Sequence, residues 1–364
     1  MKRIHTNQRL SRRRVLAAGA ATAAIGPTVF VRNGWAKGET ITIGIWAGAQ
    51  GQYVKKEVVG PFMKDYDCKV LVNEGWTLAQ IAKVRAEKAS PQHTVVFVDD
   101  LGIDILKRES LINALPKDKM KNLANVYPRF VYEDGYGVAI GVSMAGIAYN
   151  PKLIKPPASF GELWDEKYRR KITLYSARST SGPMVMITAA ALATGKPYKE
   201  AQYMVDKAWP MLEKLKPNIL NIAQSNAQAV NQVVQGESVM ELMDYSKWVY
   251  PYTKKGAPID MAYPKEGAWA GVNCMVLVKG GPQQDLGAAF MDRMLDAKVQ
   301  AGLAEFSLAA PPVKGLDFKP DVLKYLAYPE KKMDDLGLFS PDWAHVNKNR
   351  AAWTEKWNTI FTES

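Results

Sequence analysis

The chain has 364 residues, of which 47% are hydrophobic and 23% charged, and this composition is ordinary for a globular protein. Its formal net charge of +12 is unevenly distributed, because residues 1–36 contain seven lysines and arginines and no acid. Without that segment 328 residues remain with a net charge of +5, which argues against a nucleic-acid-binding protein. A chain of this length exceeds what one hydrophobic core usually organises, so we expect two lobes.

The N-terminus has the features of an export signal. Ser11–Leu16 fits the twin-arginine pattern, and the mildly apolar stretch Val15–Val31 follows directly. That stretch is too short and too rich in alanine and glycine for a membrane span. Small residues at positions 34 and 36 suit cleavage after Ala36. We therefore predict a signal peptide over residues 1–36, export by the twin-arginine machinery and a periplasmic location.

From residue 38 the sequence alternates between strands and helices. The first predicted strands are 39–46, 68–72 and 94–98. Helical patterns separate them, which favours a mainly parallel sheet that binds ligands at the carboxyl ends of its strands. Trp46 ends the first strand, Trp76 follows the second, and Asp99 and Asp100 follow the third. We interpret these four as candidate ligand-binding residues. The alternatives are core packing for the tryptophans and helix capping for the aspartates.

The segment 157–186 combines a helix start, a strand and a polar loop. Ser159 and Glu162 have the spacing of a capping box, and the short strand 172–175 follows. Pro183 favours a helix that begins at this proline. Hydroxyl groups beside a helix N-terminus form a site for a carboxylate or another anion. The loop before the proline contributes four candidate residues, which are Arg178, Ser179, Thr180 and Ser181.

Three motifs together resemble one protein family. They are Pro-x-Ser-Phe-x-x-Leu-Trp-Asp-x-Lys-Tyr-x-x-Lys-Ile at 157–172, Gly-Ile-x-Tyr-Asn at 146–150 and Pro-Lys-Glu-Gly at 264–267. Together they resemble bacterial extracellular solute-binding proteins of the spermidine/putrescine-binding type. These are type II periplasmic binding proteins of ABC importers. The resemblance implies an α/β fold of two lobes, each a mainly parallel sheet flanked by helices, with the ligand cleft between them.

The resemblance also implies how the lobes are built and used. Lobe 1 would comprise residues 38–144 and 272–318, and lobe 2 would comprise residues 145–271 and 319–364. Closure of the lobes around a small solute would couple binding to recognition by a membrane permease. Loops at strand ends line the cleft in this family, which adds Asp244 and Tyr245 to the candidate residues, and the return strand adds Asn273.

Departures from the resembled family indicate the solute. Polyamine binders compensate ammonium groups with carboxylates, but the acids expected after residue 175 and in the return strand are replaced by Arg178 and Asn273. Arg178 suits a bidentate contact with a carboxylate. Asp99, Asp100 or Asp244 would pair with an amine at the other end. We therefore predict a small carboxylate-bearing or zwitterionic, amino-acid-like solute.

Three alternatives stay open. A polyamine such as putrescine or spermidine follows from the resemblance itself. Ferric iron would require Tyr245, Tyr250 and Tyr252, and no adjacent tyrosine pair supports it. For Arg178 the alternative is a surface arginine, or a salt bridge to Glu162 or Asp165.

The sequence contains no enzymatic or metal-binding pattern. It has no Gly-x-Ser-x-Gly motif, no glycine-rich phosphate loop and no histidine paired with a nucleophile. Cys68 and Cys274 are far apart in the sequence and are interpreted as buried thiols, with a disulfide left open. We therefore predict a monomeric binding protein without catalytic residues, cofactor or metal. Its partners would be a small solute, a permease and the export machinery. A single long helix is expected from about Lys199 to Lys216, and the tryptophans after residue 340 are expected in helices across the back of lobe 2.

Overall fold

The computed structural model describes residues 38–361, and these residues belong to one compact unit. The predicted signal peptide, with its cleavage site near Ala36, lies outside the described residues. Within 38–361, no helix is both long enough and apolar enough to cross a membrane. Cys68 and Cys274 are both free thiols, so the disulfide that the sequence left open is not formed.

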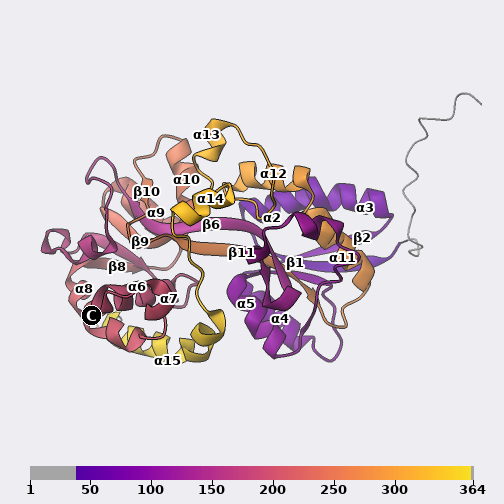
Figure 1. The fold of residues 1–364 in the computed structure, drawn as a ribbon, viewed down its shortest axis with the longest axis horizontal. Helices are drawn as coiled ribbons and strands as arrows, with labels where there is room; N and C mark the ends of the chain where they lie inside the picture. Colours follow the sequence, from indigo (N-terminus) through magenta and orange to yellow (C-terminus); the bar gives the residue numbers. More distant parts are fainter. Residues whose placement is uncertain (1–37, 362–364) are drawn as a thin grey trace, which may run out of the picture. The chain divides into compact units, whose positions relative to one another are not determined.

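One mixed sheet organises the fold, with its main strands in the order β2-β1-β3-β11-β6-β9-β7-β8 (Figure 1). The main strands are β1 (Thr40–Ile45), β2 (Lys69–Glu74), β3 (Val95–Asp99), β6 (Gly137–Tyr149), β7 (Ile172–Tyr175), β8 (Ile219–Ala223), β9 (Met240–Tyr245) and β11 (Trp269–Val278). Three short strands pair with the central strands β6 and β11, and they are β4 (Ile112–Asn113), β5 (Val131–Tyr132) and β10 (Asp260–Ala262).

The direction of the strands changes in the middle of the sheet. β1 pairs in parallel with β2 and β3, and β7 pairs in parallel with β8 and β9. Between these groups, β6 and β11 are antiparallel to each other and to their neighbours. Every residue of β6 and β11 is buried, which explains why their sequences are continuous apolar runs rather than alternating ones. The predicted α/β class, with mostly parallel strands flanked by helices, is confirmed.

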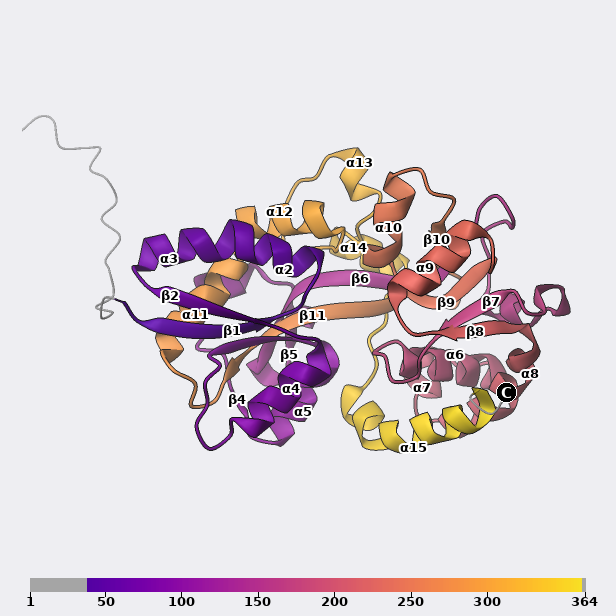
Figure 2. The same cartoon turned by 180° about the vertical axis from the view of Figure 1, so that it is seen from behind.

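Helices cover both faces of the sheet. The α-helices are α2 (Ala49–Tyr53), α3 (Gly60–Tyr66), α4 (Thr77–Ala86), α5 (Asp100–Arg108), α6 (Gly182–Thr194), α7 (Tyr198–Ala201), α8 (Ala208–Leu215), α9 (Asn226–Gln235), α10 (Ser246–Lys254), α11 (Gln284–Met294), α12 (Ala297–Ser307), α13 (Pro320–Leu323), α14 (Glu330–Asp335) and α15 (Trp343–Phe361). Figures 1 and 2 both show α2 and α3 on one face of β1 and β2, with α4 and α5 on the other face.

Two predicted helices differ from the structure. The capping box at Ser159 and Glu162 is complete, but it begins a short 3-10 helix, Phe160–Trp164, rather than an α-helix. A single long helix was predicted from about Lys199 to Lys216, and the chain forms α7, a 3-10 turn and α8 instead. Pro210 lies in the first turn of α8, where its missing N–H costs no intrahelical hydrogen bond, so a new helix start is favoured there.

The last helix connects the two ends of the sheet. Near its start, the Nδ2 atom of Asn347 donates to the carbonyl oxygen of Leu101 at 3.0 Å and to Asp104 Oδ2 at 2.8 Å. Near its end, Trp357 and Phe361 join the hydrophobic core around α6 and α8. Figures 1 and 2 show the course of α15 toward the C-terminus. Packing across the back of lobe 2 was therefore only half of its role. The division into lobes at the predicted boundaries stays a prediction.

Candidate functional site

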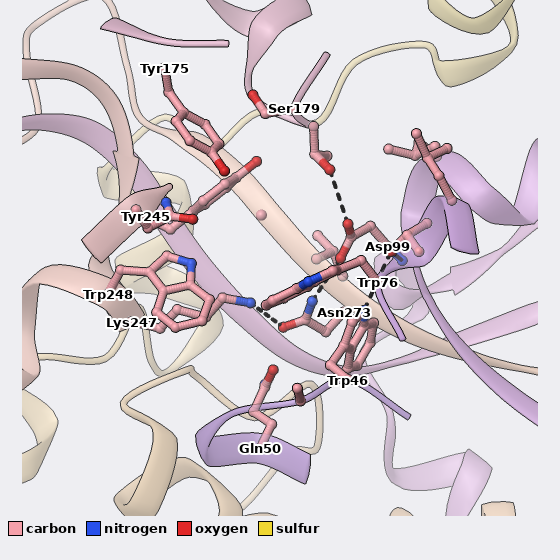
Figure 3. Close-up of a pocket in the computed structure, with 18 of the residues that line it drawn as sticks. Trp46, Gln50, Trp76, Asp99, Tyr175, Ser179, Tyr245, Lys247, Trp248 and Asn273 are labelled. Atoms are coloured by element: carbon pink, nitrogen blue, oxygen red, sulfur yellow. Dashed lines mark hydrogen bonds between the residues drawn. The ribbon is translucent and has the colours of Figure 1, made fainter. Parts of the chain in front are cut away.

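A cavity of about 250 Å³ lies where the ends of several strands meet (Figure 3). Its walls come from the segments after β1, β2, β3, β7 and β9, from the middle of β11, and from α9 and α15. Among the residues that line the cavity are Trp46, Gln50, Trp76, Thr77, Asp99, Tyr175, Arg178, Ser179, Thr180, Asn226, Tyr245, Lys247, Trp248, Asn273 and Arg350.

Most of the ligand-binding residues predicted from the sequence line this cavity. The predicted residues on its wall are Trp46, Trp76, Asp99, Arg178, Ser179, Thr180, Tyr245 and Asn273. Three predicted residues, Asp100, Ser181 and Asp244, are buried and do not line it. The structure therefore brings the loops together as expected, but the direction of each side chain decides which residues face the cavity.

Asp99 is the carboxylate of the cavity wall, and both of its oxygens accept hydrogen bonds. The Nδ2 atom of Asn273 donates to Asp99 Oδ1 at 2.9 Å, and the Oγ1 atom of Thr180 donates to Oδ2 at 3.0 Å (Figure 3). The backbone N–H of Asp99 donates to Thr77 Oγ1 at 3.0 Å. Neutral donors therefore fix the position of this carboxylate and leave its charge in place.

Lys247 was not predicted, and it continues this network. Its Nζ atom donates to Asn273 Oδ1 at 2.8 Å, so the amide of Asn273 connects an ammonium group to the carboxylate of Asp99. Burial lowers the pKa of Lys247, while Asp99 and Asp244 act in the opposite direction. Lys247 lies in the first turn of α10, directly after β9. Extending the strand-end rule by two residues would have found it.

Aromatic rings form a second part of the wall. Trp46 is buried, packs on Phe97 with ring centroids 5.5 Å apart, and donates from Nε1 to Thr77 Oγ1 at 3.4 Å. Trp76 is 58% exposed, and its ring centroid lies 6.4 Å from that of Trp248. Figure 3 shows Trp76 and Trp248 reaching the cavity from different elements. Trp248 was another residue that the sequence did not single out.

The ring of Tyr245 is packed closely against β11. A Cβ atom at Gly271 would overlap that ring, so only glycine at this position lets Tyr245 lie where it does. Its hydroxyl contacts Met184 Sδ at 3.9 Å, and burial raises its pKa well above the usual value. Tyr245 therefore acts as a neutral aromatic surface. Tyr250 pairs with Tyr263 through their hydroxyls at 2.9 Å, and neither Tyr250 nor Tyr252 lines the cavity.

Those positions weaken the iron alternative. The three tyrosines that ferric iron would require do not converge on the cavity. Among residues 38–361, no group of three or more histidine, cysteine, aspartate or glutamate side chains is placed to hold a metal ion. The side chains that do converge are aromatic rings, amides, hydroxyls, one carboxylate and several cations, which suit an organic solute.

The loop before α6 presents an exposed Arg178 at the edge of the cavity. The salt-bridge alternative for it is wrong, because Glu162 completes the capping box and Asp165 pairs with Lys167 at 2.7 Å. Ser181 occupies the N-cap position of α6 but makes no capping hydrogen bond with its side chain. Its buried hydroxyl lies 3.0 Å from the Ser179 hydroxyl, so Ser181 supports the loop from below.

Arg350 reaches the same loop from α15. Its Nη2 atom donates to the carbonyl oxygens of Arg178 at 2.8 Å and Ser179 at 3.1 Å. Its Nη1 atom is buried and has no hydrogen-bond partner in the described part of the chain. Burial lowers the pKa of Arg350, while Tyr245 and Asp99 act to raise it. No sequence signal could have found this residue, because it lies 172 positions after its loop partner.

Asp100 points away from the cavity, although it follows Asp99 directly. Asp100 begins α5, and its Oδ2 atom accepts a hydrogen bond from Ser340 Oγ at 2.7 Å. Burial raises the pKa of Asp100 to about 7. The predicted ligand role of Asp100 is therefore not supported, since consecutive side chains at the strand-to-helix junction face opposite sides.

Asp244 is displaced by a bulge in β9. Gly146 pairs with Asp244 and Ile147 pairs with Leu242, so Met243 is an extra residue, and its φ of 70° is strained for a side chain of this kind. The bulge places Asp244 on the same face as Glu241 instead of at the cavity. Asp244 Oδ1 accepts a hydrogen bond from Asn226 Nδ2 at 3.1 Å.

Glu241 and Asp244 form a buried acid pair behind the wall. Asp244 Oδ2 and both carboxyl oxygens of Glu241 have no donor among the described residues. Burial raises the pKa of Asp244 to about 6 and that of Glu241 well above its usual range, and each acts on the other. Two adjacent carboxyls without a donor are stable together only when they share a proton. We assign that proton to Glu241.

A cavity where the strand ends of an α/β fold meet is a typical place for a small ligand to bind. The sequence model of the bacterial extracellular solute-binding protein family matches residues 57–330. The chain therefore belongs to this family, as the motifs at 146–150, 157–172 and 264–267 indicated.

Individual relatives are distant. The chain is 26% identical over 243 residues to spermidine/putrescine-binding periplasmic protein 1 of Haemophilus influenzae, which covers 64% of each chain. It is also 26% identical over 231 residues to a Salmonella typhi protein designated a candidate 2-aminoethylphosphonate-binding periplasmic protein, covering 59% of this chain and 62% of the relative. The chain thus matches just under two thirds of the length of these relatives.

The solved structures agree on the fold. An ABC transporter protein of Clostridium perfringens, known at 1.85 Å resolution, superposes with a TM-score of 0.75. The two sequences are 21% identical, and the match covers 88% of this chain and 99% of the other.

Proposed function

We propose that this protein is the periplasmic substrate-binding component of an ABC importer, and that it captures a small carboxylate-bearing or zwitterionic, amino-acid-like solute. The family and the names of its relatives support the transport role. Lobe closure around the cavity would retain the solute and present it to a permease. The names of periplasmic relatives support a periplasmic location, and we propose export through the twin-arginine pattern at Ser11–Leu16.

The charges of the residues that line the cavity are the main support for a carboxylate-bearing solute. Arg178, Lys247 and Arg350 line the cavity, and Asp99 is the one acid among its lining residues. Both oxygens of Asp99 already accept hydrogen bonds from Asn273 and Thr180. A polyamine would add positive charge to a wall with an excess of cations, whereas a carboxylate would neutralise part of that excess.

A zwitterion would use both signs of charge in this wall. Its carboxylate would contact the arginines beside the loop 176–181. Its amine would approach Asp99, because each carboxylate oxygen has room for a second hydrogen bond. Trp46, Trp76 and Trp248 would cover its apolar part.

A polyamine is the second candidate. The name of the Haemophilus influenzae relative supports it, and so do the aromatic rings, which suit a methylene chain and its ammonium groups. The position of the acids argues against it, because Asp100 and Asp244 are buried outside the cavity. A single carboxylate would have to compensate two or more ammonium groups.

A thermal-shift screen on residues 37–364 tests these candidates against each other. The panel contains the standard amino acids, 4-aminobutyrate, malate and succinate beside putrescine and spermidine. Because a ligand that binds only the folded state raises the melting temperature, we expect shifts with carboxylates alone. Shifts with putrescine or spermidine alone would overturn the proposed solute class in favour of the polyamine.

A further inference from the structure

Arg350 lies on α15, a helix that contacts α5 near its start and the core around α6 and α8 near its end. Trp343, Asn347 and Arg350 are spaced i, i+4 and i+7 on α15, so they share one face. Trp343 is buried and Asn347 is hydrogen-bonded to α5. The same face therefore anchors the helix and carries the guanidinium of Arg350 to the loop 176–181.

The guanidinium is fixed but incompletely satisfied. Two carbonyl oxygens hold Nη2, which sets the plane of the group. Nη1 is buried without an acceptor in residues 38–361. A buried charged donor without a partner is costly, and the rigid fork of an arginine matches the two oxygens of a carboxylate. Arg350 lines the cavity, so an acceptor on a bound solute is the candidate partner for this donor.

The surroundings of Arg350 do not supply that partner. Carbonyl oxygens carry only partial charge, and no ion pair to Arg350 occurs in the part of the chain that the structure describes. Asp99 is the carboxylate of the cavity wall, and its hydrogen bonds come from Asn273 and Thr180 rather than from Arg350. Arg178 is exposed, so solvent screens its charge more than that of Arg350.

We propose that Arg350, contributed by the C-terminal helix, binds the carboxylate of the solute and is the main determinant of selectivity for anions. This inference rests on the proposed function, because it assigns the residue that recognises the carboxylate. It also gives α15 a second function, since the helix that links α5 to the core around α6 and α8 would contact the bound solute directly.

Three variants of the mature protein test the assignment. Arg350→Met removes the charge, Arg350→Lys keeps the charge without the fork, and Lys348→Met removes an exposed cation from the same helix as the control. Calorimetric titration would compare each amino acid, malate or succinate that binds the wild type with the primary amide of the same compound. The acid-to-amide ratio separates recognition of the carboxylate from a loss of affinity that affects both compounds equally.

We expect the wild type and Lys348→Met to prefer the acid at least tenfold, and Arg350→Met to lose that preference. Arg350→Lys should retain part of it. If Arg350→Met kept the full preference for the acid, the assignment of Arg350 would be overturned and the solute class would stand. If no carboxylate bound the wild type, the proposed solute class would fail, and the assignment of Arg350 with it.

Discussion

Asn273 on β11 lies directly opposite Asp99 on β3, and its amide donates to Asp99 while it accepts from Lys247. One neutral side chain thus separates a carboxylate from an ammonium group in the cavity wall. The resemblance to polyamine binders led us to expect an acid at this position. The asparagine therefore makes the wall one unit less negative than that acid would.

Asn273→Asp tests the effect of this charge. It would place a second carboxylate beside Asp99, which makes the wall more negative and attracts cations. We expect carboxylate affinity to fall at least tenfold and putrescine affinity to rise, measured by calorimetric titration. Asn273→Ala serves as the control, because it removes the hydrogen bonds without adding charge. Unchanged affinities in Asn273→Asp would show that the wall charge does not select the solute.

Trp76 and Trp46 separate binding from folding. Trp76 is 58% exposed, so Trp76→Ala should change the free energy of unfolding by only about 0.5 kcal/mol. It should weaken solute binding several-fold, because an aromatic surface of the cavity is lost. Trp46 is 4% exposed and packs on Phe97, so Trp46→Ala should cost roughly 3–5 kcal/mol of stability. Denaturant unfolding and titration measure both effects. Equal loss of stability in both variants would contradict this division.

Buried carboxyls make stability depend on pH. Burial raises the pKa of Asp100 to about 7 and that of Asp244 to about 6. The folded protein therefore binds more protons than the unfolded chain between pH 4 and 7. Stability should rise as the pH falls from 8 to 5, by roughly 1–3 kcal/mol for each group. Melting temperatures measured across that range test this. Asp100→Asn should flatten the profile, and a profile that falls toward acid would contradict the assignment.

The shared proton of Glu241 and Asp244 gives a separate prediction. Glu241→Gln supplies an N–H donor to Asp244 Oδ2 at every pH, so this variant should be as stable as the wild type at pH 6 and more stable at pH 8. Glu241→Ala leaves that oxygen buried and unpaired, which should cost roughly 1–3 kcal/mol. Thermal unfolding of both variants at the two pH values provides the measurement. Equal destabilisation by glutamine and alanine would rule out a shared proton.

The sequence located the cavity better than it located the residues on its wall. Strand ends converge wherever parallel strands share a sheet, so Trp46, Trp76, Asp99 and Tyr245 could be predicted from their position. The direction of a side chain depends on local geometry instead. Asp100 faces Ser340 because a helix begins there, and Asp244 turns away because Met243 forms a bulge. The helix start was the alternative that the sequence offered for the aspartates, whereas the bulge has no signature in the sequence.

Residues from distant segments were harder to predict. Lys247 and Trp248 belong to the first turn of α10, just beyond the last residue of β9. Arg350 reaches the cavity only through the packing of α15 on α5, which is a tertiary contact between segments far apart in the chain. The prediction of one helix between 199 and 216 was wrong for a local reason. Pro210 favours a new helix start that an apolar pattern does not reveal.

Calorimetric titration of residues 37–364 tests the central claim most directly. The protein would be titrated at pH 7 with each carboxylate that shifts its melting temperature, and with putrescine and spermidine. We expect a one-to-one complex with a carboxylate or zwitterion and no measurable heat with either polyamine. Tight binding of putrescine or spermidine, without binding of any carboxylate, would contradict the account.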